Sequence, residues 1–392
     1  MRFAAAVSRE RDTHHVARAL AEAVRRGLGG QPADLACLFF SIHHAERAQA
    51  LSRAVREELG PTVLIGCTGE GVIADAEEIE EGAAVTLWGA RLPGVSLAPL
   101  RLAIPEGRDA FSPAGWPDAA ALGAGRPTFL LLADPFSTPI GDALGELGDR
   151  YPQAQAIGGL AGGGHDVGEN RLLLNDEVCD GGMVGVAVTG AVKIRTVVSQ
   201  GCRPIGEPFV VTKAEHNVIH ELAGAPALER LQAVFESLES EERRLAHRAL
   251  HLGIVIDEHR AAFERGDFLV RNLIGADRGA GSLAIGDHIQ EGQTVQFHLR
   301  DGRSASEDLQ CLLAADQAKH RTAPLGALMF SCCGRGEGLF GRPHHDASAV
   351  RERVGKIPLA GFFAQGEIGP VGGSNFIHGY TASVALFAPP GI

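Results

Sequence analysis

The sequence predicts an α/β fold with two αβ-layered domains and additional antiparallel strands in the C-terminal half. Short apolar runs alternate with amphipathic segments, and three stretches share one strand–helix–strand order with a glycine-rich end. That order is typical of parallel βαβ units. Near residue 195 the glycine-rich first half gives way to a mixed region, so we place the first domain at residues 1–195 and the second at residues 196–392.

The first unit follows an opening helix. Apolar residues recur at helical spacing over residues 13–29, which predicts an amphipathic helix that covers a sheet face. Residues 35–41 (LACLFFS) are too few and too apolar for a surface helix and predict a strand. A helix over residues 45–60 and a strand over residues 62–73 complete the unit.

Two further units repeat this order of strand, helix and strand. Their segments are residues 128–137, 141–151 and 154–164, and residues 326–336, 346–355 and 357–369. The first and third copies both end in Gly-Glu, in IGCTGEGV and GFFAQGEIG, which indicates an internal duplication; the middle copy lacks that pair. We expect the two Gly-Glu turns to bring glycine-rich strand ends towards one pocket.

The remaining segments do not follow this strand–helix–strand order. Residues 182–201 predict a β-hairpin that turns at Thr189-Gly190. Residues 282–301 alternate like antiparallel strands around Glu291-Gly292, and residues 226–250 are helical in pattern. These are the additional elements of the predicted second domain.

Composition limits the function. The formal net charge is −12 and no Lys/Arg-rich run occurs, which disfavours nucleic acids and anionic membrane surfaces as partners. The opening apolar stretch is too short for a secretory signal, and no run approaches transmembrane length, so we expect a cytoplasmic protein without membrane insertion. Seven scattered cysteines without CxxC spacing fit reduced thiols better than disulfides or a structural zinc site.

The chain resembles the FIST family, in which N-terminal and C-terminal FIST domains occur as a pair. The resemblance rests on IGCTGEGV and AIGGLAGGG in the first half and on FSCCGRGEG, GFFAQGEIGP and NFIHGYT in the second. It spans nearly the whole chain. It implies a bacterial sensory protein of signal transduction that binds a small ligand, such as an amino acid or related metabolite.

The resemblance also implies how the signal leaves the protein. Many signalling relatives carry a kinase, cyclase or methyl-acceptor segment beside the pair, and this sequence shows none. We therefore expect no output domain of its own and a separate signalling protein as partner. The alternatives are a haem-binding gas sensor, a cysteine-dependent enzyme and a protein-interaction module.

Two glutamates are candidate ligand-binding residues. Glu70 and Glu367 each stand beside glycine at a predicted strand end, with Gly366 preceding the second. Flanking glycine allows close backbone approach, so the two carboxylates are suited to hold an ammonium group. Alternatively, each accepts hydrogen bonds from its own turn or caps a helix.

Arg335 is the candidate for a ligand carboxylate. It stands between Gly334 and Gly336, and its guanidinium can form two parallel hydrogen bonds while the glycine N–H groups add to them. The alternative is a structural ion pair with Glu367 or Glu337. Together with Glu367, Arg335 would form a site for a zwitterion.

The cysteines and histidines give weaker candidates. Cys332 stands at the family position and is the candidate nucleophile, whereas its neighbour Cys333 is interpreted as incidental. Most cysteines are buried apolar side chains, so we expect no catalytic residue. Adjacent histidine pairs have the wrong spacing for zinc. A single axial ligand would suffice for haem, and the candidates are His378, His216 and His220. Otherwise we expect no cofactor and no metal.

Three polar residues lie at predicted strand ends of the second half. They are Asn272, Asp277 and Asn375. They either line the same cavity, in which case Asn375 contacts the ligand, or serve as turn residues.

Overall fold

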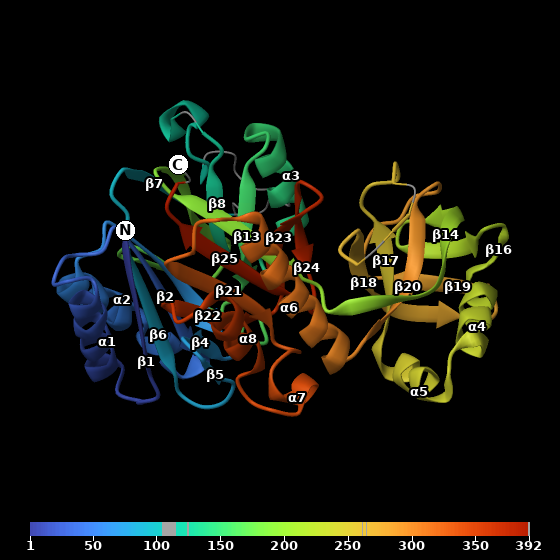
Figure 1. The fold of residues 1–392 in the computed structure, drawn as a ribbon, viewed down its shortest axis with the longest axis horizontal. Helices are drawn as coiled ribbons and strands as arrows, with labels where there is room; N and C mark the ends of the chain where they lie inside the picture. Colours follow the sequence, from blue (N-terminus) through green and yellow to red (C-terminus); the bar gives the residue numbers. More distant parts are fainter. Residues whose placement is uncertain (104–114, 124, 261, 264, 391–392) are drawn as a thin grey trace. The chain divides into compact units, whose positions relative to one another are not determined.

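The computed structural model describes the chain except residues 104–114, 124, 261, 264 and 391–392. The chain forms two compact units (Figure 1). Unit 1 comprises Met1–Val198 and Leu309–Ile392, and unit 2 comprises Ser199–Asp308. The predicted second domain, residues 196–392, therefore contributes to both units, because the chain returns to unit 1 at Leu309.

Unit 1 contains three six-stranded sheets. In order across each sheet, the first has β1 (Arg2–Ser8), β6 (Val85–Arg91), β2 (Leu35–Ser41), β3 (Val63–Gly69), β10 (Leu172–Leu174) and β11 (Glu177–Cys179). The second has β7 (Val95–Leu102), β12 (Met183–Gly190), β8 (Thr128–Ala133), β9 (Gln155–Leu160), β23 (Glu367–Val371) and β24 (Ser374–His378). The third has β13 (Lys193–Ser199), β25 (Ala382–Ala388), β21 (Gly326–Cys332), β22 (Leu359–Ala364), β4 (Val72–Ala74) and β5 (Glu77–Ile79).

The three sheets have the same plan. Each contains one parallel pair, β2 with β3, β8 with β9, or β21 with β22. Beside that pair lies a hairpin that comes from another of the three strand–helix–strand copies. The hairpin β4–β5 follows β3 in the chain but pairs with β22 of the third copy. In the same way, β10–β11 follows β9 but pairs with β3, and β23–β24 follows β22 but pairs with β9. The predicted pseudo-repeat is confirmed, and the middle copy is as complete as the others.

One glycine marks the same register in each parallel pair. Gly66 faces Leu38, Gly158 faces Leu131 and Gly361 faces Met329. A Cβ at these glycines would lie 2.2, 1.8 and 1.8 Å from the facing carbonyl oxygen. Only glycine allows the two strands to approach this closely, so these positions can be superimposed as equivalents.

Helices cover the outer face of each sheet (Figure 1). The first sheet packs against α1 (Thr13–Gly27) and α2 (Ala48–Leu59), which η1 (Ile42–Arg47) precedes. The second packs against α3 (Ile140–Arg150), with η3 (Ala119–Leu122) nearby in the chain. The third packs against α6 (Gly302–Lys319) and α8 (His345–Val354), with α7 (Glu337–Phe340) between β21 and α8. The periodic apolar positions of each helix form these contacts.

A central core joins the inner faces of the three sheets. Phe39, Phe330 and Phe362 pack with ring centroids 5.0 to 6.2 Å apart. Leu130 and Leu132 of β8 belong to the same buried cluster. Because all three sheets bury apolar side chains in one core, unit 1 is a single folding body.

Unit 2 is an antiparallel barrel with two helices. Its strands are β14 (Cys202–Glu215), β20 (Thr294–Arg300), β17 (Leu250–Val255), β18 (Phe268–Asp277), β19 (Ser282–Ile285), β15 (Val218–Leu222) and β16 (Ala225–Pro226). A further pairing of β14 with β15 closes the sheet. The helices are α4 (Ala227–Ser237) and α5 (Ser240–Ala249), which divide the predicted helical segment 226–250.

The predicted hairpin over residues 182–201 is wrong. Residues 182–201 form β12 and β13, but β12 pairs with β7 and β8 whereas β13 pairs with β25. The turn near Gly190 carries the chain from the second sheet to the third, so the two strands diverge. The antiparallel strands predicted in the segment 282–301 are present as β19 and β20, which are separate strands of the barrel and not neighbours. Among the described residues, no helix is long and apolar enough to cross a membrane.

Candidate functional site

The glycine-rich loops after β3, β9 and β22 meet in unit 1. We call them the glycine edge, comprising residues 69–71, 161–164 and 365–367. Backbone hydrogen bonds join them: Glu70 N donates to Phe363 O at 3.0 Å, Gly162 N to Thr68 O at 3.0 Å, and Leu160 N to Gly366 O at 2.8 Å. The carboxyl ends of parallel strands gather at the same edge of a sheet, and the hairpin exchange brings the three edges together.

The two Gly-Glu turns are neighbours but not equivalents. Gly66 of the first copy and Gly361 of the third occupy the same position in their parallel strand pairs. Val72 and Glu367, each six residues further along, are also equivalent, because Val72 pairs with Phe362 in the same way as Glu367 pairs with Gly159. Counting from the matched glycines therefore aligns Glu70 with Gln365, two residues before Glu367. The resemblance between the two turns in the sequence is displaced by two residues from the structural repeat.

The two glutamates have different surroundings. Glu70 is exposed, and its Oε2 accepts a hydrogen bond from Gly163 N at 3.1 Å. Glu367 is fully buried, and its Oε2 accepts a hydrogen bond from Thr381 N at 2.9 Å. Each carboxylate thus accepts a bond from outside its own turn.

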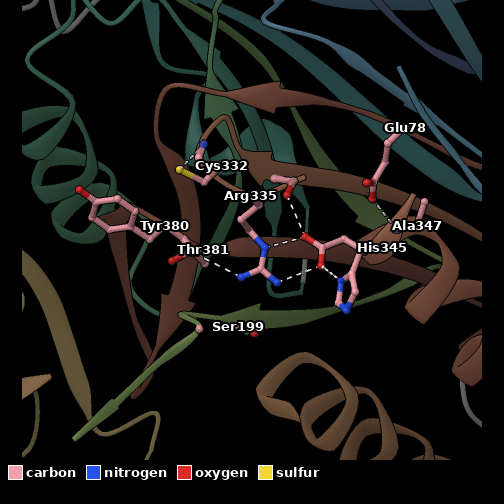
Figure 2. A network of polar contacts seen from close by, with 12 residues as sticks. Glu78, Ser199, Cys332, Arg335, His345, Ala347, Tyr380 and Thr381 are labelled. Carbon is pink, nitrogen blue, oxygen red and sulfur yellow. Dashed lines mark hydrogen bonds and ion pairs between the residues drawn. The ribbon is translucent and has the colours of Figure 1, made fainter. Parts of the chain in front are cut away.

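Arg335 forms a buried ion pair with Asp346. Its Nε and Nη2 donate to Oδ2 and Oδ1 at 2.5 and 2.9 Å, and its Nη1 donates to Tyr380 O at 3.4 Å (Figure 2). The Phe340 ring lies under the guanidinium, 5.2 Å from the ring centre to Cζ. Asp346, which the sequence analysis missed, takes the place of the predicted partners Glu367 and Glu337.

Asp346 is held from several sides. Its carboxylate also accepts from Ser331 Oγ at 3.1 Å and from His345 Nδ1 at 2.9 Å. Burial alone would raise the pKa of Asp346, but the charge of Arg335 and the hydrogen bonds from His345 and Arg335 outweigh it and hold the pKa well below the usual range. Arg335 therefore presents its bidentate face to the chain itself.

A second internal carboxylate occupies the same loop. Glu80 accepts hydrogen bonds from Glu337 N at 2.9 and 3.2 Å. A Cβ at Gly336 would lie 2.4 Å from Glu80 Oε2, so the glycine makes room for this carboxylate. The loop around Arg335 therefore contacts two carboxylates of the chain itself, those of Asp346 and Glu80.

Glu78 ties the donated hairpin to α8. Its Oε1 accepts from Ala347 N at 2.7 Å (Figure 2). Its own N–H donates to His344 Nδ1 at 2.9 Å. Burial, followed by repulsion from Asp346, raises the pKa of Glu78 to about 7. A strand of the first copy is thereby fixed to a helix of the third by a carboxyl group that titrates near neutral pH.

The two neighbouring cysteines differ in accessibility. Cys332 is buried, and Gly334 N donates to its Sγ at 3.4 Å, whereas Cys333 is exposed and its N–H donates to Ala364 O at 2.9 Å beside the glycine edge. A hydrogen bond from Cys332 lowers the pKa of Cys333, against partial burial and the charges of Glu367 and Glu70. The accessible thiol is therefore Cys333 and not the predicted Cys332.

Comparison with known proteins agrees with the motifs at this edge. The chain matches the FIST N domain over residues 34–225 and the FIST C domain over residues 227–370. It belongs to the FIST family. An uncharacterised protein of Mycobacterium tuberculosis (strain H37Rv) is 41% identical over 387 residues, covering 99% of this chain and 100% of the relative. An uncharacterised protein of Mycobacterium bovis is 40% identical over 388 residues, covering 99% of each.

The two FIST matches do not follow the compact units. The FIST N match ends at residue 225 inside unit 2, and the FIST C match contains the rest of unit 2 and most of the third copy. FIST domains are generally regarded as sensory domains of signal transduction. The glycine edge thus combines loops from both FIST domains, because β3 and β9 belong to the first match and β22 to the second.

The other predicted residues lie in different places within this FIST protein. Asn375 accepts from Ala156 N at 2.8 Å and donates to Ala154 O at 2.9 Å, at the end of β9 opposite to the glycine edge. Asn272 and Asp277 belong to unit 2. His378 is buried, with Nε2 3.0 Å from Gly369 O, a contact that haem ligation through Nε2 would have to break.

The other two haem candidates, His216 and His220, lie in unit 2. In the part of the chain that the structure describes, no group of three or more His, Cys, Asp or Glu side chains is arranged for a metal.

Proposed function

We propose that this FIST protein is a sensory protein that binds a small ligand at the glycine edge of unit 1. The ligand class is an amino acid or a related metabolite that bears an ammonium group. The exposed Glu70 would receive the ammonium group, and the buried Glu367 would act on it through its charge. The backbone of Gly366 and neighbouring loop residues would line the site. This FIST protein would pass its signal to a separate protein.

One observation carries this proposal: loops from both FIST domains converge beside an accessible thiol. The charges of Glu70 and Glu367 both act on Cys333, so both carboxylates lie within electrostatic reach of one point. Negative charge beside a polarisable thiol suits a small polar cation. A ligand there would contact both domains at once, which is what a sensor requires.

The role of Arg335 changes in this proposal. A ligand carboxylate at Arg335 would have to displace Asp346, and one at the N–H groups near Gly336 would have to displace Glu80. The geometry therefore favours recognition of the ammonium group over the carboxylate. Arg335, Gly334 and Cys332 would fix the shape of the loop that presents Cys333.

The native thiol provides the test. Alkylation of Cys333 by iodoacetamide is followed by peptide mass spectrometry while amino acids, amines and small carboxylates are added one at a time, and melting temperature is measured in parallel. We expect an amine-bearing compound to slow alkylation of Cys333 and to raise the melting temperature, because a ligand that binds only the native state stabilises it.

The matched variants are Glu70→Gln and Glu77→Gln. Both glutamates are exposed on unit 1. Glu77 lies on β5, away from the glycine edge, and forms an ion pair with Arg9. Protection should weaken in Glu70→Gln and persist in Glu77→Gln. If no compound protects Cys333, or if Glu70→Gln protects it as well as the native chain does, the proposed site is wrong and an interaction module without a ligand becomes the better interpretation.

A further inference from the structure

We infer that unit 1 contains a second ligand site, a cation-lined cavity at the edge of the third sheet that takes a small phosphorylated metabolite. The cavity has a volume of about 450 Å³. Four cationic side chains line it, together with His320: Lys193, Arg195, Lys319 and Arg321. Nothing in the glycine edge or its chemistry requires this cavity, so the two sites are independent.

The cavity lies where three segments of unit 1 meet. Lys193 and Arg195 stand two residues apart on β13, so they project from the same face of that strand. Lys319 ends α6, and His320 to Thr322 follow it as a turn. Ala388 at the end of β25 and the following Pro389 complete the wall. Volumes of roughly 300 to 1,000 Å³ are usual for small-molecule sites.

Three of the cations that line the cavity have no carboxylate partner within the described part of the chain. Among the described residues, no ion pair involves Lys193, Lys319 or Arg321, whereas the neighbouring Arg195 is paired with Asp316. The protein as a whole has a net charge of −12, so a cluster of unpaired cations is not a product of its composition. Like charges that line one concave surface repel one another, and a bound anion would relieve that repulsion.

Arg195 forms the fixed part of the site. Its side chain is only 4% exposed; Nη2 lies 2.9 Å from Asp316 Oδ2, and Nη1 donates to Thr322 O at 2.7 Å. Its buried Nε has no hydrogen-bond partner among the described residues. Asp316 also contacts His320 Nδ1 at 3.0 Å, so one carboxylate orients two lining side chains. A guanidinium held in one position at the wall of the cavity is suited to an oxyanion.

The lining also restricts the ligand. Lysine, arginine and histidine together are the usual donors to a phosphate group. The volume exceeds that of a phosphate ion, which leaves room for an organic part. None of the described residues that line the cavity is Phe, Tyr or Trp, the side chains on which a nucleobase stacks best. We therefore assign a phosphorylated aliphatic compound, such as a sugar phosphate.

The test uses the full chain with pyrophosphate and glucose 6-phosphate as probes. Binding is measured by calorimetry, with sodium sulfate and sodium chloride at matched ionic strength as comparisons. We expect saturable binding of at least one phosphate probe, and about tenfold weaker binding in Lys319→Gln and in Arg321→Gln, because charge-assisted hydrogen bonds contribute on that scale. Lys213→Gln, an exposed lysine of unit 2, is the matched control and should bind as the native chain does.

Two results would overturn the inference. Equal heats from chloride, sulfate and the phosphate probes would mean charge screening only. Equal affinity in the native chain and in a Lys193→Gln, Lys319→Gln, Arg321→Gln triple variant would place any phosphate binding elsewhere. The three side chains are exposed, so the triple variant should fold; a far-ultraviolet circular dichroism spectrum checks this. Loss of phosphate binding leaves protection of Cys333 by amines unaffected, which separates this inference from the proposed function.

Discussion

Asp346 binds Arg335 through two hydrogen bonds, at 2.5 and 2.9 Å, in a part of unit 1 where both side chains are 1% exposed or less. An arginine in a glycine-rich loop is thereby used to fix the loop and not to meet solvent. The pair also joins α8 to the loop after β21, so the strand ends of the third copy are held by electrostatics as well as by backbone bonds.

Breaking this pair should be costly. Asp346→Asn leaves Arg335 buried without its counter-charge, and we expect a loss of about 3 to 5 kcal/mol in the free energy of unfolding. Ser331→Ala removes only one neutral donor to Asp346 and should cost about 1 kcal/mol. Urea denaturation at pH 7.5 measures both. If Asp346→Asn lowers the free energy of unfolding by less than Ser331→Ala does, the pair does not stabilise the fold.

Glu78 should make stability depend on pH. Its pKa in the folded state is about 7, above the ordinary value of 4.5, so the folded protein keeps a proton that the unfolded chain releases. Its contribution is therefore greatest below about pH 4.5 and is lost as the pH rises through 7, by about 2 to 3 kcal/mol. Glu78→Gln should lose this dependence in denaturation between pH 4.5 and 7.5. Glu77→Gln, whose side chain is exposed, should retain it.

Unit 2 should respond to pH in the opposite sense. Burial lowers the pKa of His251 and His298 to about 4, so the unfolded chain binds protons between pH 6.5 and 4 that the folded barrel does not. Acidification through this range should destabilise unit 2. Hydrogen exchange at pH 7 and pH 5 should show faster exchange in β17 and β20 at pH 5 after correction for the intrinsic rate. His298→Gln should reduce the difference, and equal protection at both values in the native chain would contradict the assignment.

The close approach of the parallel strands predicts a severe effect of one methyl group. Gly361→Ala would place a Cβ 1.8 Å from Met329 O, and backbone atoms cannot move away without breaking the sheet. We expect loss of several kcal/mol in stability or failure to fold, seen as insoluble protein or a large fall in melting temperature. Gly338→Ala has open space around the new methyl group and should melt close to the native chain. Similar melting of the two variants would show that the strands can separate.

Much of this fold could be predicted from local pattern. Residues 35–41 were predicted as a strand and form β2 with those bounds. A short apolar run of this kind is typical of a strand whose sheet is buried on both faces. The hairpin exchange could not be predicted, since β4, β5, β10 and β11 are three residues long and carry no period. Their partners are chosen by the tertiary core.

The candidate site was predicted in part. The glycines and glutamates of the two turns do lie at one edge, and their sequence context was sufficient to point there. The partner of Arg335 was missed because Asp346 follows it by one short helix and a turn, where an aspartate usually means a helix start. The sequence comparison aligned Glu70 with Glu367 through their shared Gly-Glu motif. Strand register, which aligns Glu70 with Gln365, cannot be read from the sequence, so the two-residue displacement was missed.

The exchange of hairpins has a consequence for how the chain is made on the ribosome. The β4–β5 hairpin is synthesised early, but its neighbour β22 begins only at Leu359. Until β22 has been synthesised, β4 has no strand to pair with on that edge, and an unpaired strand edge promotes aggregation. Nascent chains that end before residue 359 should therefore depend on chaperones, and a gene cut between the copies should yield fragments that regain solubility only when they are produced together.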